Sequence, residues 1–266
     1  MRLKGYYINT ADILLLLNVM LFALAKVVTL SGLIEESELN SWVCVPYSLN
    51  LYLERPWTLF SYAFYHVSLS HLFWNMLFLF FTGRIFFNLF NIKQFLVAYI
   101  WGVLVGGAAF LVLGHFLPAS LGNTMLLGAS AGIISVFAFI ATVTPSYGVY
   151  IFTLRVKVLY LLGAIILFDL FDFSANSGGK IAHLGGIIAG IMVGVMAKYQ
   201  LWSRKRMRVE MPEMKSNKPE RQKVKQHRIN QLLDKINASG YASLTDKEKK
   251  FLFEASKEND MSVSYT

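Results

Sequence analysis

Three short stretches of the sequence place reactive polar side chains beside or inside strongly apolar runs. The segment LLGASAGIIS (126–135) sets the hydroxyl of Ser130 between two glycines, and AHLGG (182–186) carries the imidazole of His183. The segment HLFWN carries His71 and Asn75, which are four residues apart and therefore share one face of a helix. A hydroxyl, a base and donors aimed at a developing oxyanion are the groups that nucleophilic acyl transfer requires.

Each stretch also has a purely structural explanation when it is taken alone. The G-x-S-x-G spacing matches the nucleophile elbow of soluble hydrolases, but that elbow needs a strand before the helix, whereas LGNTMLLGAS indicates a loop entering an apolar span. His71 and Asn75 could equally form hydrogen bonds between packed helices. Small residues four apart, which let helix backbones approach closely, occur around both reactive groups: Gly128 and Gly132, then Gly186, Gly190 and Gly194.

The composition indicates a membrane protein. Hydrophobic residues make up 55% of the 266 residues, charged residues only 15%, and the mean hydropathy is +0.49. The single cysteine, Cys44, has no partner for a disulfide within the chain and is interpreted as a small apolar residue.

Six stretches are long enough to be considered as crossings of a hydrocarbon layer about 30 Å thick. The second carries His71, Asn75 and Arg84, and the fifth carries Asp169 and Asp172 near its end, so these polar groups must face protein or an interface. The predicted spans are about 11–30, 71–90, 94–113, 128–144, 155–173 and 181–199.

Basic residues fall on one side of the membrane if the six spans alternate, and this side is predicted to be the cytoplasm, with both termini inside. The first span is expected to be retained, because no cleavage site of the signal-peptide type follows it. The aromatic segment ERPWTLFSYAFYHVSLSH (54–71) is expected to lie in the outer interface. The basic residues concerned are Arg2, Lys4, Arg84, Lys93, Arg155, Lys157, Lys198 and Arg204 to Arg208.

Alternation of the spans has a chemical consequence, because the second, fourth and sixth all begin at the outer surface. Ser130, His183 and the pair His71 and Asn75 are therefore expected at the same depth. At the start of a helix, Ser130 would also benefit from unpaired backbone N–H groups and the positive end of the helix dipole.

The character of the chain changes after the last span. Residues 204–228 hold ten Lys and Arg against three Glu, a pattern that favours contact with anionic lipid over nucleic-acid binding. A short helical hairpin is predicted next, with a stop at Gly240 and a capping box formed by Thr245 and Glu248. The predicted domains are a six-span membrane domain (1–200), a basic linker (201–225) and a short cytoplasmic helical hairpin and tail (226–266).

Over about 60–199 the sequence resembles the rhomboid family of intramembrane serine proteases. The resemblance rests on HVSLSHLFWN, GAS and AHLGG in that order, on the glycines of the last span, and on RPWT (55–58), which resembles the family's interfacial loop. It implies an all-α, polytopic, six-transmembrane-helix bundle. It also implies that Ser130 is the nucleophile and His183 the base of a dyad without a carboxylate, with His71, Asn75 and the Ser130 N–H forming the oxyanion hole. Gly128, Gly186 and Gly190 would support helix packing around this site.

Four positions depart from the family pattern without removing a reacting group. Ala131 replaces the usual glycine after the serine, and Thr58 replaces the usual arginine after the loop tryptophan. Phe87 stands where glutamate is common, and Ile134 stands where some members carry an aromatic residue. These departures bear on loop geometry and substrate handling more than on the chemistry.

The predicted function is that of an intramembrane serine endopeptidase that cleaves transmembrane segments near the outer face of the bilayer. The alternative is a catalytically silent relative that binds transmembrane helices. No cofactor and no metal are expected, because His66, His71, His115 and His183 lack carboxylates or thiols in ligand-like spacing. The expected partners are transmembrane protein substrates and the lipid bilayer, with no nucleic acid. A bacterial inner membrane is the expected location, and the sequence assigns no oligomeric state.

Overall fold

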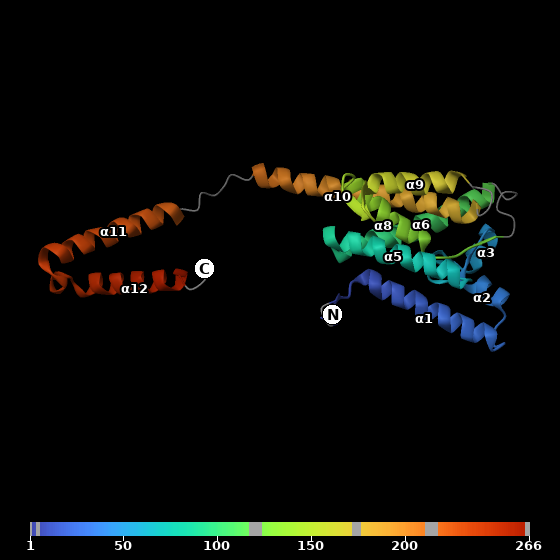
Figure 1. Cartoon of the computed structure of the whole chain (residues 1–266), viewed down its shortest axis with the longest axis horizontal. Coiled ribbons are helices and arrows are strands. Elements are labelled where there is room, and N and C mark those ends of the chain that lie inside the picture. Colours follow the sequence, from blue (N-terminus) through green and yellow to red (C-terminus); the bar gives the residue numbers. More distant parts are fainter. Residues whose placement is uncertain (1, 4–5, 117–123, 172–176, 211–217, 264–266) are drawn as a thin grey trace. The chain divides into compact units, whose positions relative to one another are not determined.

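The computed structural model describes residues 2–3, 6–116, 124–171, 177–210 and 218–263. It divides into two compact units, Met1–Arg204 and Lys205–Thr266, and each is described by itself. The first unit is an α-helical bundle, with α1 running beside α5 on one side and α9 and α10 on the other (Figure 1). Its long helices are α1 (Thr10–Leu30), α5 (Leu69–Leu89), α6 (Ile92–Phe116), α8 (Ser130–Val143), α9 (Val158–Phe171) and α10 (Ser177–Glu210).

Helix α8 occupies the centre of this bundle and contacts α5, α6 and α9. Every residue from Ala131 to Ala141 is buried. A helix that is apolar on all sides is stable only where other elements surround it, and SAGIISVFAFIATV has no polar face apart from small hydroxyls. Ser130 therefore lies at the exposed end of the most deeply packed helix.

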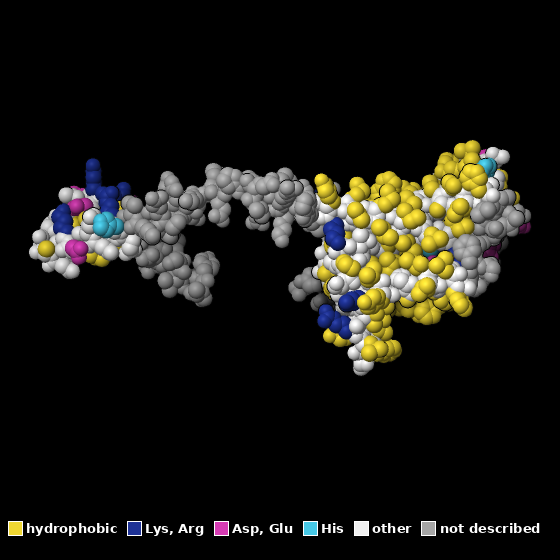
Figure 2. All heavy atoms as spheres, turned by 90° about the horizontal axis from the view of Figure 1, so that it is seen from above, with side chains coloured by type: hydrophobic (Ala, Val, Ile, Leu, Met, Phe, Trp, Pro, Cys, Tyr) yellow, Lys and Arg dark blue, Asp and Glu magenta, His cyan; other side chains and the backbone are white. Residues whose placement is uncertain are grey.

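All six predicted spans contain a helix, but the helices differ in length. Four are long and apolar enough to cross a membrane by length and composition: Thr10–Leu30, Leu69–Leu89, Ile92–Phe116 and Gly178–Tyr199. The other two, α8 and α9, have 14 residues each, which correspond to about 21 Å at 1.5 Å per residue. The count of six spans therefore remains a prediction. Hydrophobic side chains cover most of the visible flank of this unit, and Lys and Arg side chains gather at one end of it (Figure 2).

Helix α1 is attached to the bundle mainly at its beginning. Asn9 and Asp12 form a capping box, and a carboxylate oxygen of Asp12 accepts a hydrogen bond from Arg84 of α5 at 2.9 Å. Gly83 leaves room for Ala11, since a side chain at Gly83 would collide with the Ala11 methyl group. Within α1 only Ala11 and Asn18 are buried, so most of its leucines face outward, as expected for a helix in contact with lipid.

The segment between α1 and α5 is folded rather than extended. It contains α2 (Glu36–Val43), β3 (Val45–Pro46), α3 (Leu49–Glu54), α4 (Thr58–Ser61) and the 3₁₀ turn η1 (Tyr62–Phe64). The Trp42 and Trp57 rings stack at 5.8 Å, and the Arg55 guanidinium lies 4.4 Å from the Trp42 ring while donating to the Ser41 carbonyl at 2.8 Å. The residues RPWT thus form the centre of a compact aromatic cluster.

Three short two-stranded sheets connect the helices. β1 (Arg2–Leu3) pairs with β2 (Tyr6–Tyr7), and β5 (Gly148–Ile151) pairs with β6 (Leu154–Lys157) to form a hairpin between α8 and α9. The third sheet joins distant parts of the chain, because β3 pairs with β4 (Met125–Leu126) in the loop before Ser130, with Val45 opposite Leu126.

The second unit is a helical hairpin of α11 (Lys218–Ser239), the 3₁₀ turn η3 (Tyr241–Ser243) and α12 (Asp246–Val263). Gly240 follows α11 with φ +75°, and the Glu248 carboxylate accepts from the Thr245 N–H at 2.8 Å, so the stop and this half of the capping box are present as predicted. Lys235 donates to both Glu248 oxygens at 3.1 Å. These hydrogen bonds and the Lys235 charge lower the pKa of Glu248 to about 2, so the Glu248 carboxylate stays ionised at neutral pH.

Over the predicted basic linker (201–225), α10 continues to Glu210 and α11 begins at Lys218, so the described parts of this stretch are helical. Arg, Lys, Glu and Gln are good helix formers, and Pro219 stands in the first turn of α11, where the missing N–H is tolerated. Residues 211–217 of the predicted linker lie outside the described part, as does Lys4.

Close packing of α10 on α8 leads to a stability prediction. A methyl group at Gly190 would collide with the Ser135 carbonyl oxygen, whereas a methyl group at Gly163 of α9 meets nothing within 4 Å. Gly190→Ala should therefore lower the free energy of unfolding by about 1–3 kcal/mol. Gly163→Ala is the matched control and should be neutral or stabilising by up to about 1 kcal/mol, because alanine favours helix. Thermal unfolding in detergent compares the two variants, and equal effects would contradict the packing.

Candidate active site

Ser130 and His183 lie within hydrogen-bond distance of each other. The Ser130 Oγ, at the first residue of α8, is 2.9 Å from Nε2 of His183 on α10, although 53 residues separate them in sequence. The His183 side chain is 21% exposed, so it is reachable from a cavity while most of the ring is covered. A hydroxyl that donates to a neutral imidazole is the arrangement from which a base can remove the proton during nucleophilic attack.

The contact depends on small residues where α10 crosses α8 and α6. A side chain at Gly186 would collide with the Ala131 carbonyl oxygen, and one at Gly185 would lie 2.8 Å from the Gly106 Cα. On α6, a side chain at Gly106 would in turn lie 2.8 Å from the Ala131 methyl group. The backbone of α10 therefore approaches α8 more closely than larger residues allow, and His183 stands one turn before the point of closest approach.

The loop before Ser130 is held by the segment that follows α1. Gly128 has φ +103°, in the left-handed region that side chains avoid, and its N–H donates to the Tyr62 carbonyl at 2.9 Å. A Cβ at Gly128 would also lie 2.8 Å from Nε2 and Cε1 of the His71 ring. Tyr62 itself is fully buried and donates its hydroxyl to the Val103 carbonyl of α6 at 2.8 Å. Backbone conformation and space therefore both require glycine at position 128.

The start of α8 leaves backbone donors without intrahelical partners. Ala129 is the N-cap residue and has no side chain that could accept from the first turn, and the first helix-type bond recorded there runs from Ile133 N–H to the Ala129 carbonyl at 3.1 Å. The N–H groups of the first turn are those that a helix cannot satisfy internally. Together with the helix dipole they favour negative charge beside Ser130.

His71 and Asn75 of α5 line the same cavity as Ser130 and His183. Asn75 is 7% exposed, and one of its two amide hydrogens is donated to the His71 carbonyl at 2.9 Å. The backbone N–H of His71 donates to the Ser68 hydroxyl at 3.2 Å, which caps the start of α5. The cavity has a volume of about 1280 Å³, so the four predicted reactive residues share one space large enough for a peptide segment.

A carboxylate completes the cluster. Nδ1 of His183 is 2.8 Å from Oδ2 of Asp169 on α9, and Asp169 is 7% exposed. The sequence pattern did not predict this neighbour of His183: the last turns of α9 bring Asp169 against the second ring nitrogen. The sequence did contain a signal for this contact. A carboxylate such as Asp169 near the end of an apolar span is expected to face protein rather than lipid.

His66 lies beside the cluster but does not join it by hydrogen bonds. It is 1% exposed, neither of its ring nitrogens has a hydrogen-bond partner among the described residues, and its ring is 5.0 Å from that of His71. Burial and the neighbouring His71 lower the pKa of His66 to about 3, so it stays neutral at physiological pH. Its position indicates that it packs against His71 and limits the movement of that ring.

The four departures from the family pattern are accommodated by local packing. Thr58 is fully buried and donates its hydroxyl to the Arg55 carbonyl at 2.7 Å, which closes the turn of the aromatic cluster. Phe87 packs on Phe95 of α6 with ring centroids 5.0 Å apart. Ala131 fills the space facing Gly106, and Ile134 is nearly buried along the cavity wall.

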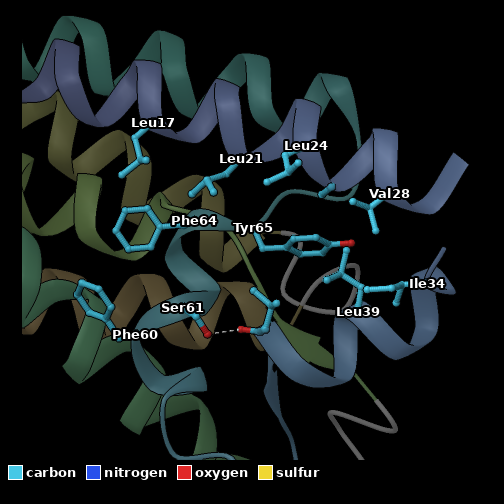
Figure 3. Close-up of a pocket in the computed structure, with 12 residues that line it drawn as sticks. Leu17, Leu21, Leu24, Val28, Ile34, Leu39, Phe60, Ser61, Phe64 and Tyr65 are labelled. Carbon is cyan, nitrogen blue, oxygen red and sulfur yellow. Dashed lines mark hydrogen bonds between the residues drawn. The ribbon is translucent and has the colours of Figure 1, made fainter. Parts of the chain in front are cut away.

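A second cavity lies away from Ser130, between α1 and the segment after it. It measures about 580 Å³, and leucines of α1 face Phe64 and Tyr65 across it (Figure 3). Its one hydroxyl apart from Tyr65 belongs to Ser61, which donates to the Val43 carbonyl at 2.8 Å. The Cys44 thiol nearby is buried, and burial raises its pKa to about 12, so it is not a nucleophile at neutral pH. This cavity therefore contains no group prepared for chemistry.

Models of known families match parts of both units. The model of the rhomboid domain matches residues 53–200, more than half of the chain, and the protein belongs to the rhomboid family. A family of unknown function, DUF6576, matches residues 217–258, which cover α11 and most of α12. No curated protein matches the chain. Among the described residues, no three His, Cys, Asp or Glu side chains are grouped as metal ligands, and the absence of a metal remains a prediction.

The position of Gly128 leads to a prediction with a matched control. Gly128→Ala should slow the reaction of Ser130 with a fluorophosphonate by about tenfold or more, because the methyl group meets the His71 ring and the backbone must leave φ +103°. Gly32→Ala carries the same kind of strain at φ +72° but meets nothing within 4 Å. That control should keep the wild-type labelling rate. Equal labelling of both variants would show that the loop before Ser130 tolerates displacement.

Proposed function

We propose that the protein is an intramembrane serine endopeptidase that hydrolyses a peptide bond of another membrane protein near the outer face of the bilayer. The observation that carries the proposal is the 2.9 Å contact between Ser130 Oγ and His183 Nε2 inside a cavity that His71 and Asn75 also line. Rhomboid membership supports the reaction class, although the family also includes inactive members.

The reaction begins when His183 takes the Ser130 proton and the hydroxyl oxygen attacks the carbonyl carbon of the scissile bond. Negative charge then develops on the carbonyl oxygen, which the Ser130 N–H, the His71 ring and the Asn75 amide stabilise. The protonated His183 gives its proton to the leaving amine. Water attacks the acyl-enzyme with His183 again as the base, and the Ser130 hydroxyl is regenerated.

The cavity favours an apolar helical substrate. Its walls combine large side chains of α5 and α9, and several of them are strongly exposed, such as Trp74 at 65% and Phe168 at 75%. A transmembrane segment presents a matching apolar surface, whereas a soluble peptide would leave these rings in water. The apolar residues concerned are Trp74, Phe78 and Phe81 of α5 and Leu161, Ile165 and Phe168 of α9.

The proposal also includes the orientation of the bundle in the membrane. Contact between Asp12 and Arg84 puts the start of α1 and the end of α5 at one end of the bundle, and Lys93 opens α6 directly afterwards. This end, where basic side chains gather in Figure 2, would face the cytoplasm, with six spans and both termini inside. A bacterial inner membrane is the simplest location, and transmembrane proteins are the proposed substrates.

The competing proposal is a silent relative that binds transmembrane helices in the same cavity without cleaving them. The two differ in the reactivity of Ser130, because a binder needs no activated hydroxyl. Retention of both the hydroxyl and the imidazole, at hydrogen-bond distance, favours the enzyme.

Removal of either reacting group tests the proposed function. Ser130→Ala and His183→Ala should each reduce cleavage of a model transmembrane substrate by about 10³-fold or more and abolish fluorophosphonate labelling. Ser135→Ala is the matched control, since this hydroxyl lies on the same helix but donates to the Ala98 carbonyl at 2.7 Å. It should keep activity with a modest loss of stability. Undiminished cleavage by Ser130→Ala would end the assignment, and a folded wild type without labelling would favour the binder.

The second unit is proposed to regulate or recruit rather than to catalyse, because the reacting residues all belong to the first unit. A chain ending at Ser203 should therefore fold and cleave the model substrate at a rate within about threefold of the full chain in detergent. Size-exclusion chromatography and the cleavage assay measure the two properties. Unfolding of the shortened chain would show that the hairpin supports the membrane unit.

A further inference from the structure

We propose that Asp169 is a positioning residue that holds His183 in the tautomer and orientation needed to act as a base, which makes the site a Ser–His–Asp relay. This inference rests on the proposed function. The observation behind it is the chain of two contacts through one imidazole ring, with Oδ2 of Asp169 2.8 Å from Nδ1 and Oγ of Ser130 2.9 Å from Nε2.

The two contacts determine where the imidazole proton lies. An ionised carboxylate only accepts hydrogen bonds, so Nδ1 of His183 must carry the hydrogen that points to Asp169. Nε2 is then left with its lone pair facing the Ser130 hydroxyl, which is the form of histidine that removes a proton from serine. Among the described residues, Asp169 is the side chain whose hydrogen bond to Nδ1 selects this tautomer.

The placement of Asp169 is costly unless it has such a role. It is the only charged residue of the apolar helix VLYLLGAIILFDLF, and its side chain is 10% exposed. A buried carboxylate is stabilised only by hydrogen bonds and opposite charge, and among the described residues its hydrogen-bond partner is His183. When His183 becomes protonated during attack on the substrate, the same carboxylate stabilises the imidazolium.

A purely structural explanation is that the contact only ties α9 to α10. The two explanations differ in how kcat and KM respond to loss of the carboxylate. Ionisable side chains near His183 come from three helices: Asp169 from α9, His71 from α5 and Lys180 from α10 itself, three residues earlier. A positioning role predicts that removal of the Asp169 carboxylate lowers kcat with KM little changed, because the substrate still binds, whereas loss of a tie that only holds α9 against α10 would change KM as well.

The experiment uses the full chain in detergent with Asp169→Asn and Asp169→Ala. Two quantities are measured across a pH series: the second-order rate of fluorophosphonate labelling of Ser130, and kcat and KM for a model transmembrane substrate. Both variants should lose about 10²-fold or more in labelling rate and in kcat, with KM little changed. Glu36→Gln, an exposed carboxylate paired with Lys26, is the control and should match the wild type.

Two outcomes separate failure of this inference from failure of the proposed function. A wild-type labelling rate and wild-type kcat in folded Asp169→Asn, with Ser130→Ala inactive, would overturn the role of Asp169 alone. Activity in Ser130→Ala would overturn both. If neither Asp169 variant folds, the inference is tested by proton NMR of the unaltered protein after Ser130 has reacted with the fluorophosphonate. A far-downfield Nδ1 proton of His183 is then expected, and its absence would overturn the inference.

Discussion

Backbone contact between α10 and α8 is the constraint on which the site depends. The Gly186 and Gly190 positions face the carbonyl oxygens of Ala131 and Ser135 with no room for a side chain. This approach brings the imidazole of His183 to the hydroxyl at the start of α8, because both lie about one turn from the crossing. Dispersion contacts and small residues, rather than the hydrophobic effect, hold helices together in lipid, so geometry of this kind must be built from glycine and alanine.

The second requirement is a fixed loop before Ser130. Contacts with the segment after α1, which is distant in sequence, hold this loop in place. The stacked Trp42 and Trp57 and the guanidinium of Arg55 give the segment after α1 its own small core. From this core β3 pairs with β4, and the Tyr62 carbonyl receives the Gly128 N–H. Pairing of strands and one glycine in the left-handed region thus connect the folded segment after α1 rigidly to the loop before Ser130. An aromatic segment that could have been a simple membrane anchor is therefore also a support for the site.

Local patterns in the sequence predicted most of this arrangement, and their limits have physical causes. Apolar length located the six helices, and the prediction that three helix starts share one depth agrees with the cavity that Ser130, His183, His71 and Asn75 line together. Helix length was less predictable, because α8 runs only from Ser130 to Val143, which is short of a full span, although the sequence pattern is apolar over 128–144. The described parts of the predicted linker over 201–225 are helical, which the helix propensity of Lys, Arg and Glu explains and the charge pattern alone did not indicate. Gly128 was noticed as a packing residue, but its positive φ follows from the loop fold and has no local signature.

Asp169 shows what a sequence pattern alone lacks. A carboxylate near the end of an apolar helix was visible as an anomaly, yet the rotation of α9 about its axis decides whether it faces lipid, water or protein. That rotation is set by packing on α8 and by the hairpin of β5 and β6, which fixes how α9 begins. Since Leu161, Ile165 and Phe168 of α9 also line the cavity, the helix that would contact a substrate is the one that carries the carboxylate. In the proposed function, the same helix would therefore both contact the substrate and hold the carboxylate against His183.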